Sequence, residues 1–202
     1  DETGELRRHV AAVDEVRQSV GIEPNAADAL LAQSPRRLLK RLDAQRALAQ
    51  RADRIGSTVL VDATHLQPNH AELVQRADVL VASERFASRW TGIGELEASC
   101  RALLQSGPTT VALTLGDDGA VGATSAADEL LWVPSYPVDI VEDTGAGDVF
   151  LGAFAYGVAQ DWSLERQVRV ANLAAGLSCA GIGSRGSIPT LSDVEGRLRR
   201  DV

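Results

Sequence analysis

Three short and almost wholly apolar segments constrain the fold of this chain more than any other feature. They run from Ser57 to Thr64, from Arg76 to Ser83 and from Pro108 to Gly116, and segments of helical pattern separate them. Strands without polar alternation are covered on both faces. This β-α-β-α-β order therefore predicts an α/β fold with a mainly parallel sheet and helices on both sides. Ligands of such sheets bind beyond the carboxyl ends of the strands.

The pattern changes after Gly119, where two apolar stretches flank a small polar loop. Residues 120–123 and 129–133 are expected to pair as a β-hairpin. Residues 137–141, with the sequence PVDIV, are expected to form one more short strand. This strand would lead directly into a glycine-rich segment.

Helices are predicted between the first strands and in the last third of the chain. The predicted helical segments are 25–56 with a break near Ser34 and Pro35, 65–75, 85–107, 148–160 and 164–180. Gly56 is expected to end the first of these segments as a C-cap residue, and Ser163 is expected to cap the start of the last.

Composition narrows the class of protein. The 202 residues, 45% of them hydrophobic, fit one globular domain over residues 1–202. No apolar run is long enough to cross a bilayer and the first residues do not form a signal peptide, so a cytoplasmic protein is expected. The net charge of −8 disfavours nucleic acid as a partner. Cys100 and Cys179 lack metal-ligand spacing and are expected to be buried free thiols.

The main candidate for a binding and catalytic site is the sequence GAGD at residues 145–148, directly before an apolar helical segment. The first residues of a helix expose unpartnered N–H groups at the positive end of the helix dipole, so Gly145, Ala146 and Gly147 are suited to hold an anion. The same amides would favour the ionised form of Asp148. A carboxylate there is placed to accept a proton from a hydroxyl that attacks a bound phosphoryl group.

Taken alone, this motif has a second interpretation. Gly-Ala-Gly can be no more than a tight turn into a helix, with Asp148 stabilised by the helix dipole, because short glycine motifs often match by chance. The surrounding segments decide between the two.

Residues 145–150, GAGDVF, resemble the signature of the ribokinase-like (PfkB) carbohydrate kinases, Asp-Thr-x-Gly-Ala-Gly-Asp followed by a small or apolar residue and Phe. Without a gap, Glu142 takes the signature's Asp position, Asp143 its Thr position and Thr144 the variable one. A deletion of one residue restores Asp143 and Thr144. In the family this half of the signature helps to form a monovalent-cation site, so the resemblance implies K⁺ binding at Glu142 and Thr144.

Other segments match the family in the same order along the chain. TLGDDG, residues 114–119, resembles the Thr-x-Gly-x-x-Gly loop that holds nucleotide phosphates; its two acids, Asp117 and Asp118, are expected to point to solvent. Asn172, which alone would be an incidental polar helix residue, resembles the helix lining the adenine pocket, and residues 183–190 resemble the closing glycine-rich loop. The implied ATP-binding residues are Thr114, Gly116, Gly119, Gly147, Asn172 and Ser83.

Ser83 is implied to bind ATP by a family motif that this chain matches only in part. The family's Asn-x-x-Glu, associated with magnesium and phosphate, falls on residues 83–86, where Ser83 replaces Asn and Phe86 replaces Glu. Glu84 either acts on Mg²⁺ through a water or caps the following helix. His65 and His70 lack a third ligand at a suitable spacing and are expected to lie in a loop.

Residues 1–10, beginning DETGE, resemble the family's lid strand. In family members this strand follows an N-terminal portion that carries a Gly-Gly phosphate-acceptor region and most sugar contacts. The chain therefore corresponds to the later two-thirds of a family member. Arg7 and Arg8 either contact an acidic substrate or stay solvated, and an exposed lid strand is compatible with a homodimer.

Together the resemblances imply an ATP-dependent kinase with a three-layer ribokinase-like sandwich. It would use ATP and Mg²⁺ to phosphorylate a hydroxyl of a sugar substrate, a ketose or sugar derivative, with Asp148 as the base. Two alternatives stay open: a nucleotide-binding homologue without catalysis, and a nucleoside or vitamin kinase of the same superfamily.

Overall fold

A computed structural model describes residues 45, 47–52, 54, 56–64, 70–182 and 187–200. Within these residues the strands are β1 (Leu60–Ala63), β2 (Val79–Ser83), β3 (Thr110–Thr114), β4 (Ala120–Thr124) and β5 (Leu131–Val133). The helices are α3 (His70–Arg76), α4 (Glu84–Thr91), α5 (Leu96–Gln105), the 3₁₀ turn η2 (Gly116–Asp118), α6 (Ala146–Ala159), α7 (Leu164–Ser178) and α8 (Leu191–Leu198).

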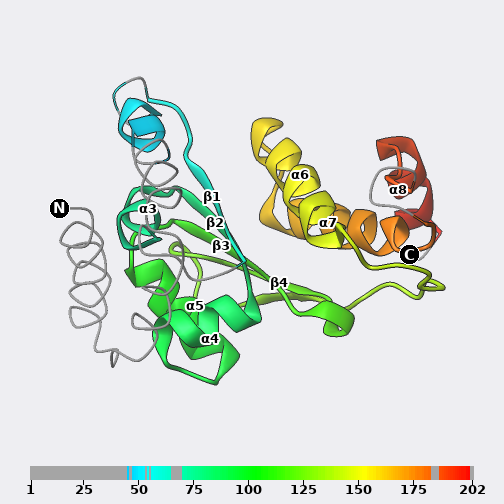
Figure 1. Cartoon of the computed structure of the whole chain (residues 1–202), viewed down its shortest axis with the longest axis horizontal. Helices are drawn as coiled ribbons and strands as arrows, with labels where there is room; N and C mark the ends of the chain where they lie inside the picture. The colour runs from blue at the N-terminus through cyan, green and yellow to red at the C-terminus, as the bar shows by residue number, and fades with distance from the viewer. Residues whose placement is uncertain are drawn as a thin grey trace, which may run out of the picture. The chain divides into compact units, whose positions relative to one another are not determined.

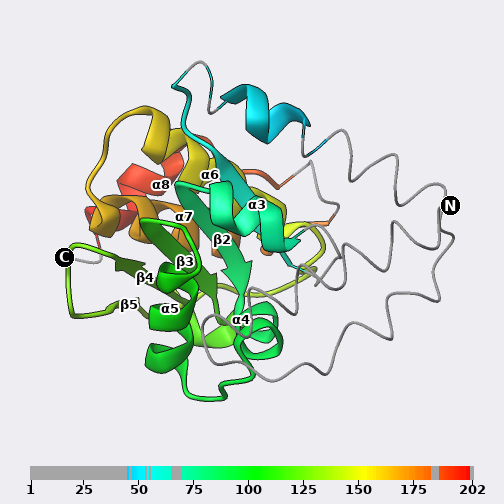
Figure 2. The same cartoon turned by 90° about the vertical axis from the view of Figure 1, so that its left-hand side faces the viewer.

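The strands form one open sheet in the order β1-β2-β3-β4-β5 (Figures 1 and 2). β1 and β2 are parallel, with Leu60 opposite Val79, and β4 and β5 are antiparallel, with Ala120 opposite Val133. The predicted α/β class and the predicted hairpin are both confirmed.

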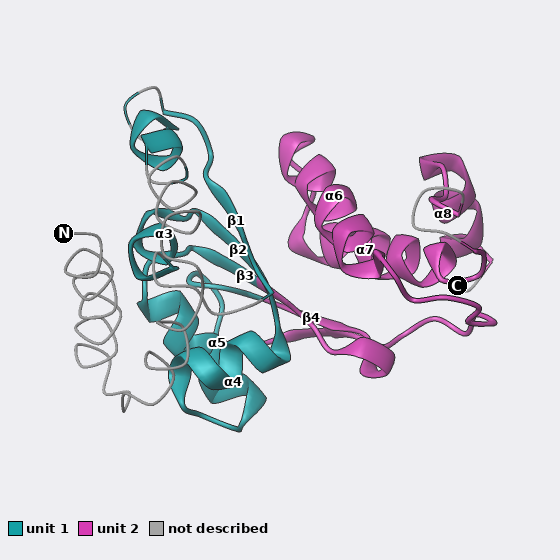
Figure 3. Cartoon of the chain, in the orientation of Figure 1, with its two compact units in different colours: residues 1–111, 123–128 teal, residues 112–122, 129–202 magenta. Residues whose placement is uncertain are grey.

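The chain divides into two compact units, coloured separately in Figure 3. Unit 1 comprises residues 1–111 and 123–128, and unit 2 comprises residues 112–122 and 129–202. The boundary falls within β3 and within β4, so each unit carries part of the sheet. A single domain over residues 1–202 stays a prediction.

In unit 1, aromatic side chains of α4 fill the core. Phe86 and Trp90 are 1% and 0% exposed and stack with their ring centroids 5.6 Å apart. His70 packs edge-on against Phe86 at 5.3 Å. The prediction that His70 lies in a loop is wrong: it is the first residue of α3 and is buried, because its ring completes this aromatic cluster. His65 lies outside the described residues.

The segment predicted to be helical over residues 85–107 contains two helices, α4 and α5. Gly92 takes the left-handed conformation, with φ of 71°, and its N–H bonds the carbonyl of Ser88 at 2.9 Å, which ends α4. Glu95 then starts α5 by accepting hydrogen bonds from the N–H groups of Glu97 and Ala98. These two caps, within four residues of each other, divide the segment into two helices.

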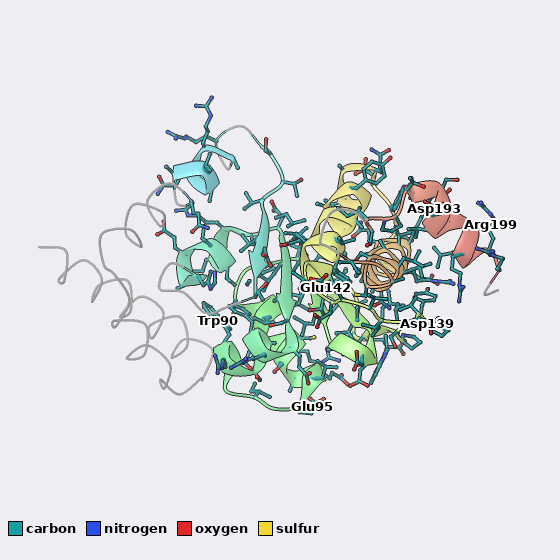
Figure 4. All side chains as sticks on the ribbon, turned by 45° about the vertical axis from the view of Figure 1, so that its right-hand side comes forward. Trp90, Glu95, Asp139, Glu142, Asp193 and Arg199 are labelled. Carbon is teal, nitrogen blue, oxygen red and sulfur yellow. The ribbon has the colours of Figure 1, made fainter. Side chains whose placement is uncertain are left out.

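In unit 2, α6 and α7 pack along each other, and α7 also contacts α8. Phe150 and Phe154 of α6 are 2% and 0% exposed and stack at 6.0 Å. Ser163 caps α7 as predicted. At the start of α8, Thr190 and Asp193 form a reciprocal capping box (Asp193 is labelled in Figure 4). The caps stabilise the N-terminal ends of α7 and α8, and the stacked rings bury one face of α6.

The strand predicted at residues 137–141 is absent from the structure. Pro137 has no N–H for a sheet ladder, and the N–H groups of Val141 and Glu142 both bond the carbonyl of Cys179, at 2.8 and 3.1 Å. This segment is therefore held by the C-terminal end of α7 rather than by a neighbouring strand.

The remaining predictions concern the helix end at Gly56, the two thiols, the segments 1–10 and 183–190, and membrane spans. Gly56 has the positive φ, 66°, of a helix C-cap, and Cys100 and Cys179 are free and buried as expected. Residues 1–10 with Arg7 and Arg8, and residues 183–186 of the loop 183–190, lie outside the described residues. Of the helices in the described part of the chain, none combines the length and apolarity that a membrane span requires.

Candidate functional site

The N-terminus of α6 is shaped by Gly145. This residue takes the left-handed conformation, with φ of 88°, and no side chain of the described residues caps the helix. The N–H of Ala146 bonds the carbonyl of Asp143 at 3.1 Å, and the next backbone bond belongs to Val149, which donates to the carbonyl of Gly145 at 3.0 Å. The N–H groups of Gly147 and Asp148 consequently have no partner among the described residues. Two donors at the positive end of a helix are available to an anion.

Space for that anion exists at Gly147. A Cβ built on this residue meets no described atom within 4 Å, and the residue is exposed. The predicted cradle is therefore open rather than filled by the chain's own side chains.

A cavity of about 440 Å³, here called the loop cavity, gathers most of the predicted nucleotide-binding residues within unit 2. Its walls include Thr114, Gly116 and Gly119 of the β3–β4 connection, Ala146 and Gly147 of α6, and Asn172 of α7. Segments separated by more than fifty residues in the sequence thus meet around one volume.

Asp148 belongs to a second cavity of unit 2, the helix cavity, of about 740 Å³ between α6, α7 and α8. Gly145 lines the same volume. The Asp148 side chain is exposed, and no basic side chain in the described ranges pairs with it. An acid on an open cavity, next to free amides, can reach a reacting group, which an acid turned into the core could not.

The β3–β4 connection owes its shape to two glycines. Gly116 has φ of 62° and Gly119 has φ of 95°, and the N–H of Leu115 closes the turn on the carbonyl of Gly119 at 2.8 Å. A Cβ at Gly119 would lie 2.2 Å from the carbonyl oxygen of Val133. Only glycine lets the loop approach the end of β5 this closely.

Asn172 is 9% exposed, and its amide nitrogen donates to the carbonyls of Val133 at 3.3 Å and Pro134 at 2.8 Å. Asn172, predicted to belong to the helix that lines the adenine pocket, lines the loop cavity and also links α7 to the backbone that follows β5.

Ser83 and Glu84 lie in unit 1, whereas both cavities belong to unit 2. The Ser83 hydroxyl caps α4 by accepting from the N–H of Phe86 at 3.1 Å and donates to the carbonyl of Thr64 at 3.3 Å. Glu84 is exposed in the first turn of α4, where its charge stabilises the helix dipole. Roles in nucleotide or magnesium binding stay predictions for both residues.

Glu142 and Thr144, the predicted cation ligands, precede α6 and line neither cavity (Glu142 is labelled in Figure 4). Asp143 between them lines the loop cavity, as does Asp117. The prediction that Asp117 and Asp118 face solvent agrees with their exposure. In the ranges that the structure describes, no group of three His, Cys, Asp or Glu side chains is arranged to hold a metal ion.

Sequence reasoning missed the wall formed by residues 135–138 and by Cys179. The segment PVDIV suggested a strand, and a strand would have placed these residues in the sheet. The signal that could have identified the wall was Pro137, which disfavours a central strand. Burial raises the pKa of the Cys179 thiol, so the group at the cavity wall is neutral at neutral pH.

The open mixed sheet, the glycine-rich start of α6 and the β3–β4 loop define an α/β protein of the ribokinase-like class. The chain belongs to the pfkB family of carbohydrate kinases, whose family model matches residues 12–191.

Individual relatives show the same likeness. Ribokinase of Bacillus subtilis is 33% identical over 137 residues, which are 68% of this chain and 45% of that protein. Deoxyribokinase of Salmonella typhi is 31% identical over 121 residues, 57% of this chain and 39% of that protein. Ribokinase of Arabidopsis thaliana, solved with ribose and ATP, superposes with a TM-score of 0.72 at 25% identity over 78% of this chain and 53% of that one. The chain spans about half the length of the relatives it matches, or less.

Proposed function

We propose that the protein is an ATP-dependent kinase that transfers the γ-phosphoryl group to a hydroxyl of a carbohydrate, a ketose or sugar derivative. The observation that carries the proposal is the position of Asp148, exposed on an open cavity in the same helical turn as the free N–H groups of Gly147 and Asp148. Family membership supports the same chemistry, since the Arabidopsis relative was solved with ribose and ATP.

The residues of the loop cavity fit the phosphates of ATP. The N–H groups of Gly147 and Asp148 point to no described acceptor, and the Cβ position of Gly147 is empty, so oxygen atoms have both donors and room. Thr114 adds a hydroxyl and Gly116 a close backbone approach. These groups would bind the phosphates and hold them against α6.

Mg²⁺, when bound with ATP, would neutralise charge on the phosphates. Mg²⁺ usually takes one or two protein carboxylates besides phosphate oxygens and waters, so a cluster of three acids is not required. Asp117 and Asp143 are the carboxylates on the loop cavity, and Glu84 is the candidate implied by the family resemblance. K⁺ at Glu142 and Thr144 remains part of the proposal.

Two groups of the first turn of α6, a carboxylate and backbone N–H groups, would have separate roles in phosphoryl transfer. Asp148 accepts the proton of the acceptor hydroxyl, which increases the nucleophilicity of that oxygen. The N–H groups of Gly147 and Asp148 donate hydrogen bonds to the oxygens on which negative charge develops. Because acid and amides belong to one helical turn, the packing of Phe150 and Phe154 fixes both at once.

ADP release by the whole chain with ATP, Mg²⁺ and a panel of ketoses, aldoses and nucleosides tests the proposal. The wild type is expected to turn over one of the sugars, and Asp148→Asn is expected to lose turnover while keeping its affinity for ATP. Asp161→Asn is the matched control, because Asp161 is exposed and its φ of 52° suits Asn as well as Asp.

Two results would contradict the proposal. Turnover retained in Asp148→Asn would remove the acid from the chemistry, and ATP binding without turnover of any acceptor would support a nucleotide-binding homologue instead.

A further inference from the structure

We propose that Asn172 is a positioning residue that shapes the loop cavity through the backbone it holds, an inference that rests on the proposed function. Its side chain lines the cavity, yet its amide nitrogen is committed elsewhere. A primary amide has two N–H donors, and here two carbonyls accept from it, those of Val133 at 3.3 Å and Pro134 at 2.8 Å. The amide nitrogen therefore donates to the chain's own backbone at the end of β5.

The backbone that Asn172 holds also lies against Gly119. A Cβ on Gly119 would be 2.2 Å from the oxygen of Val133 and 2.6 Å from both the carbonyl carbon of Pro134 and the nitrogen of Ser135. The backbone at the end of β5 thus accepts hydrogen bonds from Asn172 of α7 and lies in close contact with the β3–β4 loop. We call Gly119, Val133, Pro134 and Asn172 the clasp.

The clasp sets the spacing between two walls of one cavity. Thr114 and Gly116 line the loop cavity ahead of Gly119, and residues 135–138 line it directly after Pro134. The clasp holds the start of this wall, whereas its later part is held by other contacts: Tyr136 packs against the core of unit 2, and the carbonyl of Pro137 accepts from Arg197 at 3.4 Å. Losing the two hydrogen bonds of Asn172 would let the wall move relative to the loop, and nucleotide affinity would fall.

Asp148 lies outside the clasp, on the helix cavity. Weakening the clasp should therefore raise the dissociation constant and the KM for ATP and leave kcat almost unchanged. A general loss of folding would instead reduce the fraction of active protein and with it kcat.

Asn172→Asp is the first test, because it keeps the shape of the side chain and replaces the donor nitrogen by an oxygen facing two carbonyl oxygens. Gln167→Glu is the matched control. Gln167 lies on the same helix, is also 9% exposed, and donates from its amide nitrogen to the carbonyl of Trp162 at 2.7 Å, but it does not line the loop cavity. Both variants lose an amide donor to a backbone carbonyl.

Isothermal titration with Mg-ATP and thermal unfolding are measured on the whole chain. Both variants are expected to lower Tm, and only Asn172→Asp is expected to raise the ATP dissociation constant, by about tenfold, the equivalent of about 1.4 kcal/mol. Should Asn172→Asp fail to fold, Asn172→Ala removes the donors without adding charge and is expected to raise the constant in the same direction.

Equal dissociation constants in the Asn172 and Gln167 variants would overturn the inference and leave the proposed function standing. A wild-type chain that binds no ATP would contradict the proposed function, and this inference with it.

Discussion

Gly147 and Asp148 are adjacent in the first turn of α6, yet Gly147 lines the loop cavity and Asp148 lines the helix cavity. Successive residues of a helix point about 100° apart around its axis, so two adjacent residues of one turn can line different volumes. Under the proposed function, the phosphoryl donor and the hydroxyl acceptor would approach this turn from different sides. In-line transfer requires that arrangement.

Two glycines of this turn should respond in opposite ways to alanine. Gly145→Ala forces a side chain into a left-handed conformation with φ of 88° and is expected to cost about 1–2 kcal/mol of stability. Gly147→Ala introduces a better helix former into open space, so its Tm should stay equal or rise, while its Cβ occupies the space in front of the amides and weakens ATP binding. Thermal unfolding and ATP titration of both variants measure this. A Gly147→Ala protein with unchanged ATP affinity would show that the cradle is not used.

A monovalent cation is expected to raise the rate of turnover. Replacing K⁺ by tetramethylammonium at constant ionic strength should lower kcat several-fold in the wild type, and Glu142→Gln should remove the difference between the two salts. Glu129→Gln, an exposed change in the β4–β5 connection, should respond to K⁺ as the wild type does. Equal rates in both salts for the wild type would exclude the predicted cation site.

Chemical labelling of Cys179 should show whether Mg-ATP occupies the loop cavity, because this residue lines it. Cys179 is 7% exposed, whereas Cys100 is 1% exposed in the core of unit 1, where burial raises the pKa of its thiol to about 12. Because the thiolate is the reactive form and burial also raises the pKa of Cys179, labelling should be slow at neutral pH. A maleimide is expected to modify Cys179 before Cys100, and Mg-ATP should slow the modification. The Cys100→Ser variant isolates the signal, and protection by Mg-ATP equal to that by Mg²⁺ alone would contradict the assignment of the cavity.

Local signals predicted part of this structure and not the rest. Ser163 and Gly56 cap helix ends that lie within one turn of them, so the neighbouring sequence was sufficient to predict their roles. Pro137 argued against a strand at residues 137–141, but the position that this segment takes instead depends on a carbonyl of Cys179 some forty residues later. Asn172 was predicted to line the cavity, but its bonds to Val133 and Pro134 arise only when α7 meets β5. Long-range hydrogen bonds of single side chains leave no periodic trace in a sequence.

Burial of His70 makes the stability of unit 1 depend on pH. Desolvation lowers the pKa of His70 from 6.5 to about 4, so the folded chain binds its proton less readily than the unfolded chain. The contribution is complete above pH 6.5 and is lost as the pH falls from about 6.5 to about 4, by roughly 3 kcal/mol in all. Hydrogen bonds lower the pKa of Glu95 and Asp193, so their contributions begin to be lost as the pH falls through the ordinary carboxylate values of 4.5 and 3.8, at the lower end of this window, and they are lost equally in a His70 variant. Urea unfolding between pH 7 and pH 4.5 should show a falling free energy in the wild type and a flatter curve in His70→Leu. Parallel curves for the two proteins would mean that the imidazole titrates alike in the folded and unfolded chains.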